Sequence, residues 1–122
     1  MNALLDAVLE PLARTAGVRA AVLAAEDDGV PVHAVAHEDV HAETLAALGC
    51  RLYRSARLAG QRAGFGASRM MHIEAEAGQV CVTRAGNMSG ALVLIVLAES
   101  DANIGAVRIA LDRAAAAAVG AT

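Results

Sequence analysis

One uninterrupted apolar run, residues 91–98 (ALVLIVLA), constrains the fold of this chain more than any other stretch. It is too short to cross a bilayer, which takes roughly 20 residues. Its β-branched content, between Gly90 and the acidic segment that starts at Glu99, predicts a strand. Because such a strand is apolar on both faces, we expect it in the middle of a sheet that is covered on both sides.

The rest of the chain supplies elements that can provide this sheet and its covers. Apolar periodicity and turn residues predict the order α-β-β-α-β-β-β-α. The predicted ranges are a helix up to about residue 16, strands 18–25 and 30–37, a helix from 39 or 41 to about 63, strands 69–76 and 79–84, the central strand 91–98, and a helix from 101 or 103 to about 119.

The character of each strand predicts its place in the sheet. Strand 18–25 is apolar on both faces and therefore central, whereas Pro31 puts the next strand at an edge, since proline cannot donate a ladder hydrogen bond. Short turns join the last three strands into a meander. We expect one α/β (α+β) domain over residues 1–122, with a five-stranded antiparallel sheet in the order 2-1-5-4-3 between one long helix and two terminal helices.

The composition excludes several classes of function. The net charge of −3 gives no general attraction to nucleic acid or anionic lipid, and aromatic residues make up only 2% of the chain, too few for base stacking. The absence of lysine excludes a Walker-type phosphate loop and Schiff-base chemistry. We therefore expect no nucleic-acid partner and no membrane span. The start of the chain does not read as a signal peptide, so we expect a cytoplasmic protein.

No residue pattern predicts a catalytic, cofactor-binding or metal-binding site. No Ser/His/Asp or Cys/His arrangement can be identified from spacing, so we expect the protein not to be an enzyme. His37 and His41, with their acidic neighbours, form a polar patch rather than a defined ligand set. Cys50 and Cys81 lie far apart without a CxxC pattern, and we interpret them as buried free thiols.

Strand 69–76 would form the second edge of the sheet, and it has neither Pro nor Lys to prevent pairing with another chain. In the long helix, a stripe of Leu and Ala at helical spacing predicts the face that packs on the sheet; it consists of Leu45, Leu48, Leu52, Ala56, Ala59 and Ala63. Beside this stripe lies a row of small residues and one ring. We expect a two-fold homodimer through the row and the edge strand, with Gly49, Tyr53, Ala56, Gly60, Met71 and Ile73 at the interface.

Three segments, taken in order, resemble the roadblock/LC7 (dynein light chain, MglB-like) family. They are the hairpin 22–32 (VLAAEDDGVPV), the middle-helix sequence 45–48 (LAAL), and the entry to the last helix, 102–108 (ANIGAVR), with its Asn-aliphatic-Gly-x-x-Arg pattern. The resemblance implies a profilin-like roadblock fold and a dimeric regulatory or scaffolding partner of a small Ras-like GTPase. Bacterial members are similar to MglB, the partner and activator of a gliding-motility GTPase.

In such pairs the GTPase brings its own nucleotide site, Mg²⁺ and catalytic residues, and the dimer contributes a surface that repositions them. Arg51, Arg54 and Arg57 on the long helix are the candidate partner-binding residues. An arginine supplied in trans can accelerate GTP hydrolysis by about 10³–10⁵, but a solvated helix face that docks the partner is the simpler interpretation. The alternative function is an adaptor subunit of a bacterial signalling complex with no effect on GTP turnover.

Overall fold

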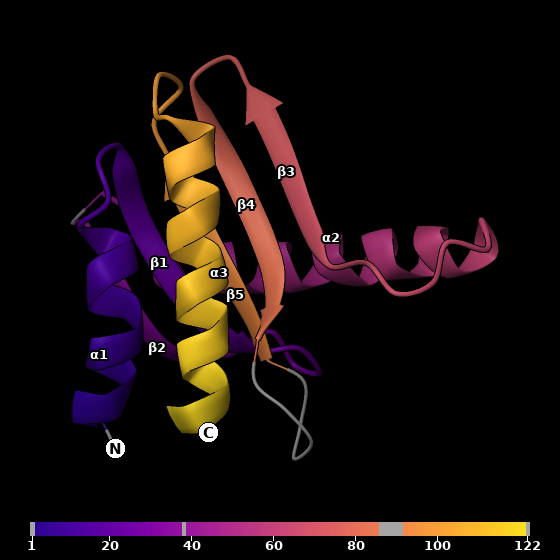
Figure 1. Cartoon of the computed structure of the whole chain (residues 1–122), viewed down its shortest axis with the longest axis horizontal. Helices are drawn as coiled ribbons and strands as arrows, with labels where there is room; N and C mark the ends of the chain where they lie inside the picture. Colours follow the sequence, from indigo (N-terminus) through magenta and orange to yellow (C-terminus); the bar gives the residue numbers. More distant parts are fainter. Residues whose placement is uncertain (1, 38, 86–91, 122) are drawn as a thin grey trace.

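The computed structural model describes residues 2–37, 39–85 and 92–121 and confirms the predicted order of elements (Figure 1). The elements are α1 (Asn2–Ala13), β1 (Val18–Ala25), β2 (Pro31–Ala36), α2 (Ala42–Arg62), β3 (Met70–Ala75), β4 (Gly78–Ala85), β5 (Leu92–Ala98) and α3 (Ile104–Ala121). The strands form one antiparallel sheet in the order β2-β1-β5-β4-β3, as predicted. The predicted start of the central strand, Ala91, lies outside the described residues.

The apolar run forms the centre of the sheet. β5 pairs with β1 on one side and β4 on the other, and its residues from Val93 to Val96 are fully buried. Successive side chains of a strand point to opposite faces. Leu94 and Val96 belong to the core under α1 and α3, whereas Val93 and Ile95 belong to the core under α2.

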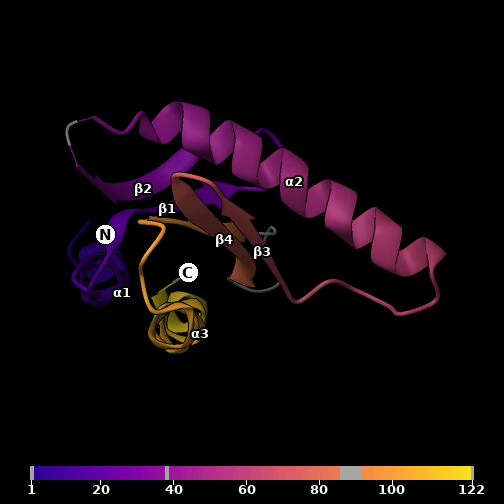
Figure 2. The same cartoon turned by 90° about the horizontal axis from the view of Figure 1, so that it is seen from above.

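The three helices are divided between the two faces of the sheet (Figure 2). α1 and α3 lie side by side on one face, where Leu9, Leu12, Val107 and Leu111 are fully buried. α2 covers the other face by itself. Because one helix is narrower than a five-stranded sheet, α2 cannot cover its whole face, and this difference between the two faces positions the candidate site.

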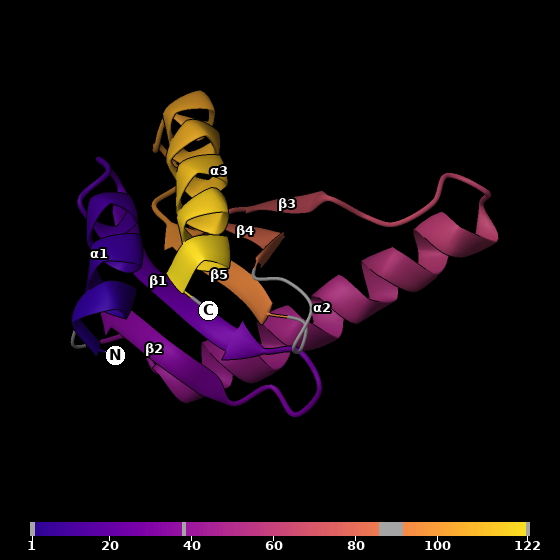
Figure 3. The ribbon, with the colours of Figure 1, turned by 60° about the horizontal axis from the view of Figure 1, so that its bottom comes forward.

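The second half of α2 extends beyond the β3 edge of the sheet (Figure 3). All the buried residues of α2 lie between Ala46 and Tyr53. The chain then returns to β3, and the Ser68 hydroxyl donates a hydrogen bond of 2.7 Å to the Ala56 carbonyl at the base of the extension. We call residues 56–66 the arm.

Candidate interaction surface

The face of α2 that packs on the sheet differs from the predicted face. It is made of Ala46, Gly49, Cys50 and Tyr53, and the Tyr53 residue is 1% exposed. A Cβ atom added at Gly49 would lie 2.5 Å from Ile95 Cδ1, so the absence of a side chain lets the helix approach β5 closely. Gly49 and Tyr53 are both buried against their own sheet in the single chain, and their place at a contact between two copies stays a prediction.

Gly60 also has a neighbour in its own chain. A Cβ atom at this position would lie 2.8 Å from the carbonyl oxygen of Gly66, where the chain turns back at the end of the arm. Ala56 is half-buried at the base of the arm. Ala56 and Gly60 are thus both half-buried in the single chain, and their place at a contact between two copies stays a prediction.

The stripe of Leu and Ala was predicted to pack on the sheet. It lies instead on the side of α2, next to the face that packs on the sheet. Leu52 precedes Tyr53 by one residue, which turns it by about 100° around the helix from the buried row. Leu48 is 51% exposed, and Ala59 and Ala63 are exposed on the arm. We call the six residues Leu45, Leu48, Leu52, Ala56, Ala59 and Ala63 the α2 stripe. Three of them are exposed in the single chain and three are half-buried, and Leu45 packs against the core under α2.

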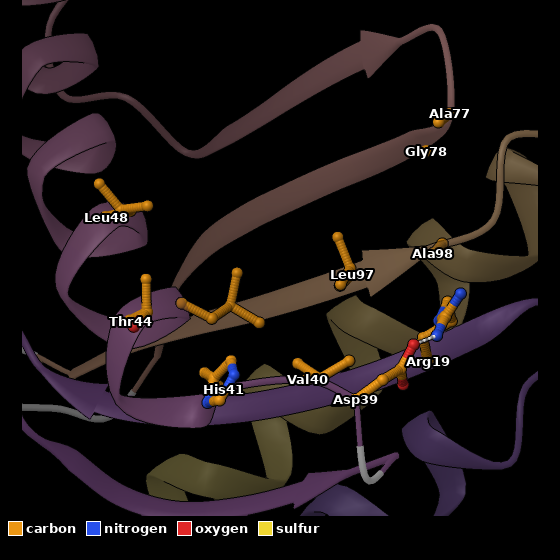
Figure 4. Close-up of a pocket in the computed structure, with 11 residues that line it drawn as sticks. Arg19, Asp39, Val40, His41, Thr44, Leu48, Ala77, Gly78, Leu97 and Ala98 are labelled. Carbon is orange, nitrogen blue, oxygen red and sulfur yellow. Dashed lines mark hydrogen bonds and ion pairs between the residues drawn. The ribbon is translucent and has the colours of Figure 1, made fainter.

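A groove of about 400 Å³ lies where the α2 stripe meets the uncovered part of the sheet (Figure 4). Its walls are Leu45 and Leu48 of α2 and Leu97 of β5, and the turn at Ala77–Gly78 closes its far side. We call this cavity the groove. It is mostly apolar, and Val40, His41, Thr44 and Ala98 complete its lining together with a single ion pair.

The ion pair joins Arg19 of β1 to Asp39, which precedes α2. The hydrogen bond from the Arg19 guanidinium lowers the pKa of Asp39 and raises the pKa of Arg19 itself. Both groups are accessible to solvent, so the pair marks the polar end of the groove rather than adding much to stability.

β3 continues the same apolar surface to the edge of the sheet. Met71 and Ile73 are half-buried on the α2 face, opposite Val82 and Val80 of β4 in the register of the pair. Within the described residues β3 pairs with β4 alone, so its outer row of backbone groups is available for another strand. The predicted edge position of Met71 and Ile73 agrees with this placement.

The three candidate arginines of α2 have different environments. Arg57 forms an ion pair with Glu26, whose side chain is only 4% exposed, and its guanidinium lies 5.9 Å from the centre of the Tyr53 ring. Arg57 therefore compensates a buried charge of its own chain, and its role as a partner-binding residue stays a prediction. Among the described residues, no carboxylate lies within ion-pair distance of Arg51 or Arg54, and these two side chains remain candidates.

Sequence reasoning missed the role of Glu26. The sequence predicts a turn in the segment that Glu26 opens, Glu26-Asp27-Asp28-Gly29. In the structure this segment joins β1 and β2. Nothing in the order of the residues distinguishes a buried carboxylate from the two that follow it. The signal lies in the fold, which brings Arg57 to this carboxylate from α2.

The described residues contain no grouping of three His, Cys, Asp or Glu side chains that could hold a metal ion. Within them, no helix has both the length and the apolar character needed to cross a membrane. Cys50 and Cys81 are buried and free, and burial raises the pKa of both thiols, which disfavours the reactive thiolate.

The surface on the α2 face thus combines the unpaired β3 edge, the arm beyond that edge and the apolar groove beside it. The chain belongs to the Roadblock/LC7 domain family, whose sequence profile matches residues 4–98. This family was the one that the three sequence segments resembled, and the match covers most of the chain.

Similar proteins agree with this assignment. The uncharacterized protein MJ0714 of Methanocaldococcus jannaschii is 28% identical over 115 residues, which are 94% of this chain and 93% of the relative. The gliding protein MglB of Thermus thermophilus has the same fold, with a TM-score of 0.83 at 20% identity over 97% of this chain and 87% of that chain. A Roadblock/LC7 domain from Streptomyces avermitilis has a TM-score of 0.77 at 25% identity, over 95% and 92% of the two chains.

Proposed function

We propose that this chain is a homodimeric regulatory or scaffolding partner of a small Ras-like GTPase in the cytoplasm. The observation that carries the proposal is the apolar surface formed by the α2 stripe, the groove and the β3 edge, which the chain does not cover itself. Membership of the Roadblock/LC7 family and the resemblance to MglB supply the class of partner.

In the proposed dimer, β3 of one copy pairs antiparallel with β3 of the other across a two-fold axis. The axis is perpendicular to the sheet, so the two sheets join and both α2 helices lie on the same face. Met71 and Ile73 lie at the seam, and the arm of each copy passes over the sheet of the other. The β3 edge and the α2 stripe are then covered by a single contact.

The dimer then offers the outer side of both α2 helices to a partner. Arg51 is turned by about 200° from the buried Tyr53, so it points away from the sheet, and Arg54 lies on the flank of the helix. A GTPase carries its own nucleotide site and Mg²⁺, and its regulator needs only a surface that repositions the catalytic residues. We therefore assign Arg51 and Arg54 to docking, and no catalytic residue to this chain.

The test is to mix the purified protein with each Ras-like GTPase encoded in the same genome, and to measure binding and the rate of phosphate release from GTP. We expect one GTPase to bind and to change its rate. The double variant Arg51→Ala, Arg54→Ala should weaken this binding by about tenfold or more. The matched control is Arg14→Ala, an exposed arginine that directly follows α1 on the opposite face, which should have no effect.

The outcomes separate the two candidate functions. Binding without any change in the rate of hydrolysis would favour the adaptor alternative over the regulator. If no GTPase of the genome binds and none changes its rate, the proposed GTPase partnership is wrong.

A further inference from the structure

The tip of the arm carries an unusual side chain. Phe65 is the only phenylalanine in the chain, and it is 88% exposed. It lies between Gly64 and Gly66, whose φ angles of +77° and +86° are conformations that glycine adopts without strain. The Phe65 amide donates a hydrogen bond of 2.9 Å to the Gly60 carbonyl, so the turn that presents the ring has a defined backbone.

We propose that Phe65 of each copy anchors the dimer by inserting into the groove of the other copy. This inference rests on the proposed homodimer and names the contact that holds the arm in place. A phenyl ring gains much from burial, yet the arm offers it no cover. The groove, in turn, is an apolar cavity with an exposed Leu48 at its mouth.

The groove is large enough for the ring. Its volume is about 400 Å³, whereas an apolar cavity of about 150 Å³ in another protein binds benzene. Leu45, Leu48 and Leu97 give the ring aliphatic contacts on both the helix and the sheet. The charges of Arg19 and Asp39 at the polar end already compensate each other, so an apolar occupant leaves no charge without a counter-charge.

The length of the arm matches the distance to the groove of a second copy. From Ala56, where the arm begins, to Arg62 the helix advances by about 9 Å. Neighbouring strands lie about 4.8 Å apart. An arm that crosses the β3 edge therefore passes over about two strands of the second sheet, β3 and β4, and the next strand is β5, which carries Leu97.

The composition of the α2 stripe favours a second copy as the occupant. Its first half is made of leucines and its second half, on the arm, of alanines. When two α2 helices run antiparallel across the two-fold axis, the alanines of each arm face the leucines of the other helix. Large residues then meet small ones along the whole contact, an arrangement that allows close packing.

The test is the dimer dissociation constant measured by sedimentation equilibrium. We expect Phe65→Ala to raise it by roughly 30-fold, the scale of an interface hot spot. Leu48→Ala should raise it as well, and the double variant should be less affected than the product of the two single effects, because both changes remove the same contact. Ile109→Ala, an exposed apolar residue of α3 on the opposite face, is the control and should leave the constant unchanged.

Ile73→Lys on β3 separates this inference from the dimer itself. If Ile73→Lys yields monomers while Phe65→Ala leaves the dissociation constant unchanged, the dimer stands and the anchor is wrong. If the effects of Phe65→Ala and Leu48→Ala multiply fully, the ring binds elsewhere and the groove is wrong as its site. If the unaltered protein is monomeric at all concentrations, the proposed dimer and the anchor both fail.

A photo-crosslink gives a second measurement that does not depend on affinity. Phe65→p-benzoylphenylalanine keeps an aromatic side chain at the tip and reacts with nearby C–H groups on illumination. In a mixture with isotope-labelled protein, we expect a crosslink from the labelled to the unlabelled chain at Leu48 or Leu97. Crosslinks confined to one chain, in a protein that is still dimeric, would overturn the proposal.

Discussion

The buried carboxylate of Glu26 determines how the role of Arg57 is interpreted. Among the residues that the structure describes, Glu26 is the only charged residue that is buried, and Arg57 is its ion-pair partner. A carboxylate without a compensating charge in this position is costly, because it has lost most of its water. The guanidinium of Arg57 therefore has a structural task in its own chain.

We predict that Arg57→Ala lowers the free energy of unfolding by about 2 kcal/mol, since it leaves Glu26 buried without its partner. The measurement is urea denaturation at neutral pH. Arg51→Ala removes the same charge from the exposed side of α2, and we expect it to change the free energy of unfolding by less than about 0.5 kcal/mol. Equal effects of the two variants would show that the ion pair with Glu26 does not stabilise the fold.

The three arginines of α2 also mark a limit of sequence reasoning at this scale. Helical spacing gives the direction of each side chain around the axis, and Arg51, Arg54 and Arg57 all fall outside the predicted stripe. Helical spacing does not predict which loop passes beside the helix. The contact that distinguishes Arg57 from the other two spans 31 positions in the chain, and only the folded arrangement of β1 and α2 reveals it.

At the scale of elements, the strands were more predictable than the packing of α2. An apolar run with two buried faces, Pro31 at an edge and short turns between the last strands were enough to predict the order β2-β1-β5-β4-β3. For α2 the pattern contains two adjacent apolar sides, the stripe with its leucines and the row with Gly49 and Tyr53. The leucines suggested the wrong face, because the helix approaches the sheet closely at Gly49 and buries the Tyr53 ring against it.

We predict that Gly49→Leu lowers the free energy of unfolding by about 2–3 kcal/mol, since the new side chain has to displace Ile95 from the core. Gly120→Leu near the end of α3 is the matched control, because a Cβ atom there meets no other atom within 4 Å. Thermal and urea unfolding of both variants provide the measurement. If Gly49→Leu proves as stable as the control, the close approach of α2 to β5 is not what requires glycine.

At the scale of the whole molecule, folding and assembly are linked in the proposed dimer. The single chain leaves the α2 stripe, the groove and Phe65 in contact with water. Covering them adds to the stability of the folded state, and the gain grows with protein concentration by mass action. The melting temperature therefore reports the assembly without any partner protein.

We predict that the melting temperature rises by about 3 °C for each tenfold increase in concentration, given an unfolding enthalpy of about 0.7 kcal/mol per residue in both chains of the dimer. Differential scanning calorimetry between micromolar and near-millimolar protein measures this slope. Ile73→Lys should abolish the slope because it blocks pairing of the β3 edges. A melting temperature that is independent of concentration in the unaltered protein would argue against the dimer.

The arm contributes nothing to the hydrophobic core of its own chain. Substitutions of Ala63 and Phe65 can therefore accumulate without loss of folding, unlike those of Gly64 and Gly66 with their positive φ angles, and their effect would appear in a neighbouring molecule instead. In an organism with several chains of this kind, changes at positions 63 and 65 would be sufficient to change the pairing partner from an identical chain to a paralogue. Hybrid assemblies with two unlike outer surfaces can arise in this way while each subunit keeps the same scaffold.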